Sequence, residues 1–160
     1  MIVRPTTDAD LQAIAELTSA CNRALAVSEN YTAAELAGLL AECSSLASIR
    51  RQYAAFTSFV SEQAGTVIGV VAVAGDEIAQ LFVAPHFQHQ GIGRRLVSVA
   101  EAQIRACGHA KARVYTASAP AYYQPLGYVE TERRRCTEGP LAGRTLVFFE
   151  KVLEDNPKPN

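Results

Sequence analysis

The fold is decided by one stretch, residues 78–96, whose sequence is IAQLFVAPHFQHQGIGRRL. Its pattern predicts a strand over residues 78–83, a turn, a glycine-bearing loop and the start of a helix. Gly91 and Gly93 can bring bare backbone close to a ligand and can take dihedral angles that are closed to other residues. The first turn of the helix adds free N–H groups and the positive end of its dipole. The stretch therefore predicts an anion site, and phosphate is the usual ligand of such a site.

The residues after the loop extend this unit. Apolar side chains recur at helical spacing from Ile92 through Leu96 to about Cys107, and Gly108 closes the pattern. Residues 112–116 then predict another strand. A strand, a helix and a second strand in this order favour a parallel pair with a right-handed crossover.

The region before residue 55 predicts a short strand and two helices. Residues 2–4 are a strand candidate, and Asp8 is expected to cap the helix that follows. Thr32 and Glu35 predict a capping box for the second helix. The boundary of any further helix between residues 43 and 53 stays open.

The other strand candidates complete a sheet. Residues 56–62 and 67–73 are β-rich runs that most simply pair antiparallel with each other and with 78–83. A short helix is expected over 119–126, and two more strands over 128–135 and 144–151. We therefore predict an α/β fold whose central mixed antiparallel and parallel sheet (α+β type) has six or seven twisted strands, flanked by helices.

Length and composition indicate one ordinary globular domain. A chain of 160 residues can bury one core, which we place over residues 1–154, with a frayed tail over 155–160. The net charge of −1 offers no attraction for nucleic acid or for an anionic membrane. No apolar run approaches the roughly 20 residues that span a bilayer, so we expect a cytoplasmic protein.

The four cysteines suggest neither a metal site nor a disulfide framework. Cys21, Cys43, Cys107 and Cys136 are far apart, with no Cys-x-x-Cys pair and no histidine at ligand spacing. We expect no bound metal, and reduced thiols in or near the core.

Three segments in the right order carry a resemblance to a known family. The loop Gln88-His89-Gln90-Gly91-Ile92-Gly93 resembles the Arg/Gln-x-x-Gly-x-Gly/Ala signature of the GCN5-related N-acetyltransferase (GNAT) superfamily. Residues 81–85 resemble the strand that runs beside the pantetheine arm in that family, and residues 122–128 resemble its Phe-Tyr-x-x-x-Gly-Phe signature. The order of predicted elements is similar to the GNAT fold over nearly the whole chain.

The resemblance implies an acetyl-CoA-dependent N-acetyltransferase that works by direct attack of a primary amine. Backbone groups would hold the pyrophosphate and the pantetheine amides, and a backbone N–H near Val83 would stabilise the oxyanion. The residues expected to contact acetyl-CoA are Leu81, Phe82, Val83, Gln88, His89, Gln90, Gly91, Ile92, Gly93, Arg94 and Ser118.

The resemblance also implies two catalytic side chains. Tyr123 matches the tyrosine that often protonates the departing thiolate in the family, whereas Tyr122 is expected to pack elsewhere. For the general base we choose Glu77, acting through a water, with Asp76 as the alternative.

One position departs from the family pattern. The family often has an asparagine shortly after the strand that ends here near Thr116, and this chain has Thr116-Ala117-Ser118 instead. Either Ser118 or Thr116 replaces a cofactor hydrogen bond, or one of them caps the helix expected near residue 119.

Other functions stay open at this point. A non-catalytic acyl-CoA-binding or sensing module would share the fold and the loop, and a protein or peptide amine could be the acceptor. We expect a small-molecule amine because no acidic groove for a basic peptide is evident. A Rossmann nucleotide site fits poorly because Leu96 stands at its third glycine position. The sequence leaves a homodimer open.

Overall fold

The computed structural model describes residues 1–118 and 120–154, so the predicted tail 155–160 lies outside the described residues. The elements are β1 (Ile2–Pro5), α1 (Leu11–Ser28), α2 (Ala33–Cys43), α3 (Leu46–Tyr53), β2 (Thr57–Gln63), β3 (Thr66–Ala74), β4 (Glu77–Val83), α4 (Ile92–Ala106), β5 (Lys111–Thr116), β6 (Val129–Arg135) and β7 (Thr145–Val152). Short 3-10 helices lie at Asp8–Asp10, Pro85–Phe87, Pro120–Tyr122 and Gln124–Leu126.

The seven strands form one sheet in the order β1-β2-β3-β4-β5-β7-β6. β4 and β5 are parallel, and the other neighbouring pairs are antiparallel. Helix α4 connects the parallel pair, as the sequence predicted. The predicted mixed sheet is confirmed, and it has seven strands.

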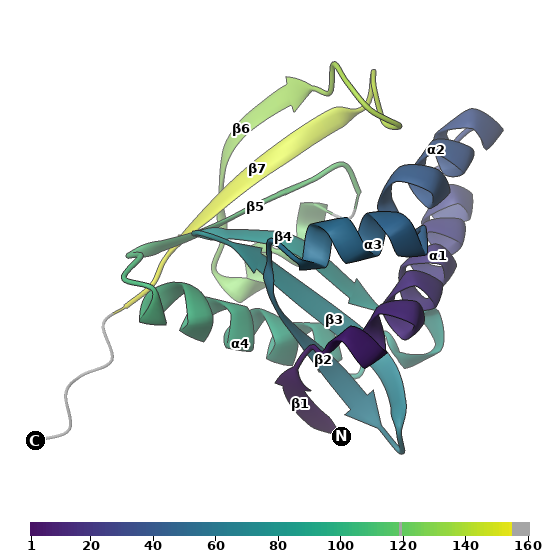
Figure 1. The fold of residues 1–160 in the computed structure, drawn as a ribbon. Coiled ribbons are helices and arrows are strands. Elements are labelled where there is room, and N and C mark those ends of the chain that lie inside the picture. The colour runs from purple at the N-terminus through teal and green to yellow at the C-terminus, as the bar shows by residue number, and fades with distance from the viewer. Residues whose placement is uncertain (119, 155–160) are drawn as a thin grey trace, which may run out of the picture.

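Strand β3 is covered by helices on both faces. Val71 and Val73 pack in a cluster with α4, whereas Val70 and Ala72 pack in a second cluster with α1 and α3. Successive side chains of a strand point to opposite faces. The continuous apolar run of β3 is therefore the centre of both layers of the core, which Figure 1 shows as helices on either side of the sheet.

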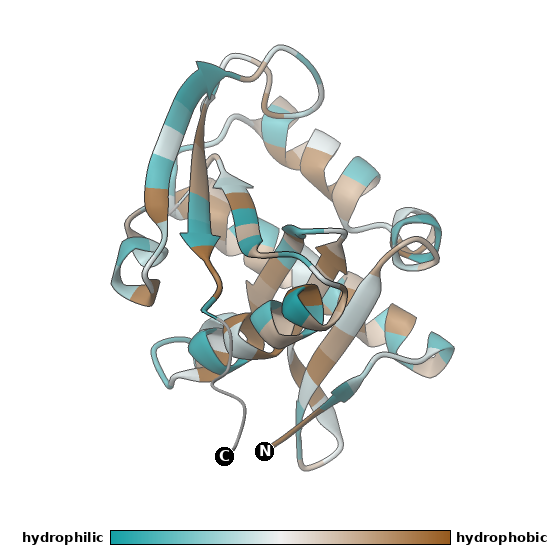
Figure 2. Ribbon diagram, turned by 90° about the vertical axis from the view of Figure 1, so that its left-hand side faces the viewer, coloured by the Kyte–Doolittle hydropathy of each residue, from teal (hydrophilic) through white to brown (hydrophobic). Residues whose placement is uncertain are grey.

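Strand β6 is a polar edge of the sheet. All seven of its residues are exposed, and Figure 2 shows the strand as hydrophilic along most of its length. Charged side chains on an edge strand discourage pairing with a second chain.

Thr7, and not the predicted Asp8, begins the first helical segment. The backbone N–H and the hydroxyl of Thr7 donate to Oδ2 of Asp10 at 2.8 and 3.0 Å. Arg4 binds both carboxylate oxygens of Asp10 at 2.8 Å. The hydrogen bond of Arg4 holds the pKa of Asp10 well below its usual range. Asp8 is wrong as the cap, because Thr7 is the N-cap of the 3-10 helix Asp8–Asp10 and Asp10, held by Arg4 and Thr7, is the N-cap of α1.

The second and third helices begin at side-chain caps. The predicted capping box is confirmed, since the N–H of Thr32 donates to Glu35 at 2.7 Å and the N–H of Glu35 donates to Thr32 Oγ1 at 3.1 Å. Ser45 caps α3 by accepting from the N–H of Ser48 at 3.3 Å.

Within residues 1–118 and 120–154, no helix is long and apolar enough to cross a membrane.

The helix predicted over 119–126 is wrong in type. Residue 119 lies outside the described part, and the rest forms two 3-10 helices, Pro120–Tyr122 and Gln124–Leu126. Pro125 has no N–H to donate and disfavours α-helical angles at the residue before it. The break at Tyr123 changes the directions of the two neighbouring tyrosine rings.

Candidate active site

Strands β4 and β5 meet at one end and separate towards the other. Both strands lie wholly within the described residues, and their one pair in register is Glu77 with Arg113. By contrast, β5 pairs with β7 along all of its length, from Lys111 to Thr116. Figure 1 shows β5, β6 and β7 diverging from β2, β3 and β4. One edge of β4 is therefore open within the sheet.

The open edge of β4 presents the backbone of Leu81 and Val83. Ala84 donates its N–H to the carbonyl of Ile68 in β3, at 2.9 Å. Backbone groups of successive residues in a strand point in alternate directions. Phe82 therefore directs its N–H and C=O towards β3, and of the three predicted β4 contacts only Leu81 and Val83 direct theirs into the opening.

The hydrogen bonds of the Val83 carbonyl show that it points away from β3. It accepts hydrogen bonds from the side chains of Cys21, at 3.3 Å, and Gln88, at 3.1 Å. Burial raises the pKa of the Cys21 thiol to about 11. A thiol that keeps its proton at neutral pH is a poor nucleophile, so Cys21 holds α1 against the end of β4.

The loop between β4 and α4 has the geometry of an anion site. His89 and Gly91 have φ angles of 60° and 80°, and Gly91 is the N-cap of α4. Left-handed residues before a helix turn successive N–H groups towards one point, where the helix dipole also favours negative charge. Gln88, His89, Gln90, Gly91 and Arg94 are exposed, whereas Ile92 is buried and anchors the helix. The loop therefore fits a pyrophosphate.

The hydroxyl of Tyr122 lies against Gly93 at the start of α4. A Cβ on Gly93 would collide with this hydroxyl and would lie 3.7 Å from Cγ2 of Val83. Tyr122 is 38% exposed, so its ring lies at the surface of the core and not within it. Burial of its hydroxyl end raises the pKa of Tyr122. The expectation that Tyr122 packs away from the site is wrong.

Tyr123 lies deeper, among other aromatic rings. Its ring centroid is 5.2 Å from that of Tyr122, 5.7 Å from Tyr128 and 5.8 Å from Phe149. Tyr123 is 8% exposed, and burial raises the pKa of its phenol. The phenol is therefore protonated at neutral pH, which is the state that a general acid requires.

The two candidate bases differ in their surroundings. Arg113 donates to Asp76 at 2.7 Å, and this hydrogen bond lowers the pKa of Asp76. Glu77 is half-buried, and burial raises its pKa, while the positive charge of Arg113 opposes the shift. A carboxylate with a raised pKa is the better proton acceptor, so these surroundings favour Glu77 over Asp76 as the candidate base.

Glu77 and the anion loop lie at opposite ends of β4. At about 3.3 Å per residue, the path from Glu77 to Val83 is about 20 Å. Glu77 instead lines a cavity of about 310 Å³. The other residues around this cavity are Arg113, Val114, Tyr115, Thr131, Glu132, Arg134, Phe148, Phe149 and Glu150.

The segment after β5 forms a turn stabilised by a threonine. The N–H of Ser118 donates to Oγ1 of Thr116 at 3.0 Å, and the Thr116 hydroxyl donates to the carbonyl of Ser118. Such turns mimic a backbone turn. Thr116 therefore closes a turn where the family often has asparagine, and its hydroxyl is engaged within that turn.

A clasp around Arg144 joins distant parts of the chain near the site, and the sequence did not predict it. Arg144 donates to both carboxylate oxygens of Glu35, at 2.9 and 2.8 Å, and to the carbonyl of Glu29 at 3.1 Å. Its guanidinium carbon lies 4.7 Å from the centre of the Tyr31 ring. The clasp fixes the connection between α1 and α2 to the hairpin of β6 and β7. Arg144 and Glu35 are 109 residues apart, so no local pattern links them.

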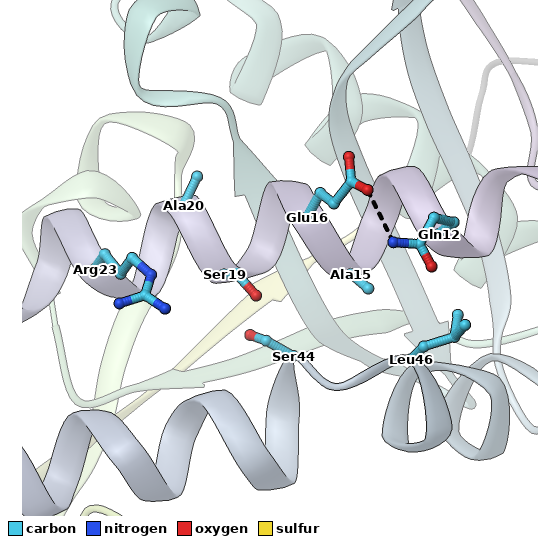
Figure 3. A pocket seen from close by; sticks show the side chains of 8 residues that line it. All are labelled: Gln12, Ala15, Glu16, Ser19, Ala20, Arg23, Ser44 and Leu46. Atoms are coloured by element: carbon cyan, nitrogen blue, oxygen red, sulfur yellow. Dashed lines mark hydrogen bonds between the residues drawn. The ribbon is translucent and has the colours of Figure 1, made fainter.

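A second hollow, of about 430 Å³, lies beside α1. Figure 3 shows it between α1 and the connection from α2 to α3, with a hydrogen bond of 2.8 Å from Gln12 to Glu16 on its wall. Its lining includes none of the predicted site residues. We therefore place the site at the β4–β5 opening.

Solved structures share this architecture. A GCN5-related N-acetyltransferase from Rhodopseudomonas palustris superposes with a TM-score of 0.83 at 19% identity, over 95% of each chain. The PaiA N-acetyltransferase from Thermoplasma acidophilum, solved in complex with coenzyme A, has a TM-score of 0.77 at 18% identity, over 95% of this chain and 98% of its own. The protein yncA from Salmonella typhimurium, solved with its cofactor acetyl-CoA, has a TM-score of 0.66 at 25% identity, over 100% of this chain and 98% of its own.

The family comparison covers most of the site. No curated protein matches the chain. The sequence profile described as the acetyltransferase (GNAT) domain matches residues 27–142. This span is more than half of the chain and contains β4, the anion loop, α4 and both tyrosines. The chain therefore belongs to the GNAT family of acetyltransferases.

Proposed function

We propose that the protein transfers an acetyl group from acetyl-CoA to a primary amine of a small molecule. The opening between β4 and β5 carries this proposal, because it joins an anion loop at one end of β4 to the carboxylate of Glu77 at the other. Acetyl-CoA is a long molecule with phosphates at one end and an activated acetyl thioester at the other. The solved relatives with bound coenzyme A or acetyl-CoA support this donor.

The backbone does most of the donor binding in this proposal. N–H groups between Gln88 and Arg94 bind the pyrophosphate, while Leu81 and Val83 pair with pantetheine amides as an added strand would. Gly91 has open space where a Cβ would lie, so a ligand can approach the start of α4 closely there, whereas the hydroxyl of Tyr122 fills that space at Gly93. Ser118 stays a proposed contact through its side chain.

Three groups serve the chemistry. Glu77 accepts the proton that the acceptor amine loses, through a water, and a backbone N–H on the open edge of β4, closer to Glu77 than Val83 is, stabilises the negative charge that develops on the acetyl oxygen. Tyr123 donates a proton to the departing thiolate. A C–N bond forms and a C–S bond breaks, and the net transfer moves one proton from nitrogen to sulfur. The attack is direct in this proposal, with no cysteine-bound intermediate, because no cysteine lies in a motif matched to the site.

A screen of amines that follows release of the free CoA thiol tests this function, with acetyl-CoA binding measured by calorimetry alongside. We expect micromolar to millimolar binding and thiol release with at least one small primary amine. Binding with no release for any amine would indicate a sensing module, and release with peptide amines alone would indicate a protein acceptor. Absence of binding at millimolar acetyl-CoA would contradict the whole proposal.

A further inference from the structure

The cavity at Glu77 has the size of a site for a small acceptor. Its volume of about 310 Å³ is at the lower end of ligand pockets, which span roughly 300–1,000 Å³. It lies where β4 and β5 meet, at the end of the opening that is remote from the anion loop. The walls come from β4, β5, β6 and β7.

The floor of the cavity is aromatic and partly uncovered. Tyr115 and Phe148 face each other across β5 and β7, with ring centroids 5.3 Å apart and ring planes 26° apart. Tyr115 is 46% exposed, although β5 is an inner strand of the sheet. The exposed part of the Tyr115 ring suits a flat apolar ligand.

A guanidinium stands above this floor. The Arg134 carbon Cζ lies 4.4 Å from the centre of the Phe148 ring. The neighbouring Arg133 is bound to Glu130 at 2.5 and 3.0 Å, and Arg113 is bound to Asp76. Within residues 1–118 and 120–154, Arg134 takes part in none of the ion pairs. Arg134 therefore has donors available for a ligand carboxylate.

The negative end of the cavity is Glu77. Tyr115 lies close enough to both Glu77 and Arg134 for each to affect its phenol. Its pKa is raised first by burial and then by the charge of Glu77, and is lowered by the charge of Arg134. Both charges therefore act on the same phenol. Glu150 on β7 and the exposed Glu132 on β6 add two more carboxylates to the lining. The cavity thus offers a carboxylate that can bind an amine, a flat aromatic floor, and a guanidinium that can bind a carboxylate.

We propose that the acceptor is an aromatic α-amino acid or a close analogue, with its amine at Glu77, its ring on the open side of Tyr115 and its carboxylate at Arg134. This inference rests on the proposed function. The amine nitrogen forms the bond to the acetyl carbon, the C–S bond breaks, and the proton lost by nitrogen ends on the CoA thiol.

The test compares kcat/KM for L-phenylalanine, for phenethylamine, which lacks the carboxylate, and for L-alanine, which lacks the ring. A hydrogen-bonded charge typically contributes about 1.5–3 kcal/mol, or about 10- to 150-fold, so we expect phenylalanine to exceed phenethylamine by that ratio. Arg134→Gln should reduce the ratio to about one, because the same variant protein acts on both substrates and a general folding defect cancels. Arg133→Gln, on the next residue of β6, is the matched control and should keep the wild-type ratio.

Equal kcat/KM for phenylalanine and phenethylamine in the wild type, or an unchanged ratio in Arg134→Gln, would overturn the inference. So would thiol release with aliphatic diamines and none with aromatic amines, a result that leaves the proposed function standing. Failure of the proposed function is different, since it is absence of acetyl-CoA binding or of thiol release with every amine.

Discussion

Glu77 of β4 and Arg113 of β5 form the one pair in register between these two strands, and beyond this pair the strands diverge. Parallel neighbours normally continue to exchange hydrogen bonds along their length. Here β5 instead follows β7, so the opening begins directly beside Glu77. The position of a half-buried carboxylate at this point links the shape of the sheet to the proposed chemistry.

Glu77→Gln should lower activity without lowering stability. We expect kcat to fall by about 10²- to 10⁴-fold, the usual contribution of a placed base, and the acidic limb of the pH–rate profile to disappear. Folding raises the pKa of Glu77 through burial. The associated stabilisation is therefore complete below the unfolded value of about 4.3 and is lost as the pH rises through the folded value. At pH 7 the variant should melt at the same temperature or higher.

Asp76→Asn is the control for this experiment. Asp76 has its pKa lowered by Arg113, so its loss should lower the melting temperature and leave the acidic limb in place. A Glu77→Gln variant with wild-type kcat and an intact limb would show that Glu77 is not the base.

Substitutions of the two adjacent tyrosines should change different kinetic constants. Tyr123→Phe removes the proposed proton donor, so kcat should fall by about 10²- to 10⁴-fold with little change in KM for acetyl-CoA. Tyr122→Phe removes the hydroxyl that lies against Gly93, so the KM for acetyl-CoA should rise while kcat changes little. Steady-state kinetics of both variants with one confirmed acceptor make the comparison, and the reverse pattern would assign the proton to Tyr122.

Substitution of either loop glycine by alanine should lower the free energy of unfolding, for a different reason at each position. Gly91 has a φ of 80° and open space around the position of a Cβ, so Gly91→Ala should cost about 1–2 kcal/mol of unfolding free energy through backbone strain alone. At Gly93 the obstacle is the hydroxyl of Tyr122. Gly93→Ala combined with Tyr122→Ala should therefore destabilise less than the sum of the single changes, by roughly 0.5–3 kcal/mol. Urea unfolding measures each value, and strict additivity at Gly93 would contradict the contact.

The Arg144 clasp predicts a loss of stability in acid. The hydrogen bond of Arg144, followed by that of the Thr32 N–H, lowers the pKa of Glu35 to about 2. The stabilisation is complete above the unfolded value of about 4.3 and is lost as the pH falls towards 2. Arg144→Gln should melt at a lower temperature than the wild type at pH 7, and the difference should shrink below pH 4.

Arg144→Lys keeps the charge but not the two-pronged geometry, so its melting temperature should lie between those of the wild type and Arg144→Gln. Equal melting temperatures for all three proteins across this pH range would show that the clasp does not stabilise the fold.

Local patterns predicted much of the fold and the loop of the site. The capping box of Thr32 and Glu35 joins residues three apart, and the anion loop consists of a strand end, glycines and a helix start that are consecutive in the chain. The Asp8 cap failed for a related reason, because Asp10 is recruited by Arg4 from β1 and moves the start of the helix. Short-range spacing could not include that partner.

The parts that sequence reasoning missed depend on distant contacts or on backbone type. The Arg144 clasp and the Tyr115–Phe148 floor bring together residues from different elements, which no spacing rule identifies. Tyr122 was misplaced because a helix was expected where Pro125 and the preceding turn give two 3-10 segments. The strand pattern of β4 also could not show which of its backbone groups face β3, since that requires the register of the sheet.

Amide chemical shifts of ¹⁵N-labelled protein during titration with acetyl-CoA test the central claim most directly. We expect the largest changes at the N–H groups of Leu81 and Val83 and of residues 88–93, with a smaller change at Phe82, whose N–H faces β3. Changes centred on the hollow between α1 and the α2–α3 connection, at Gln12, Ser19 and Ser44, or no changes at millimolar acetyl-CoA, would contradict the claim.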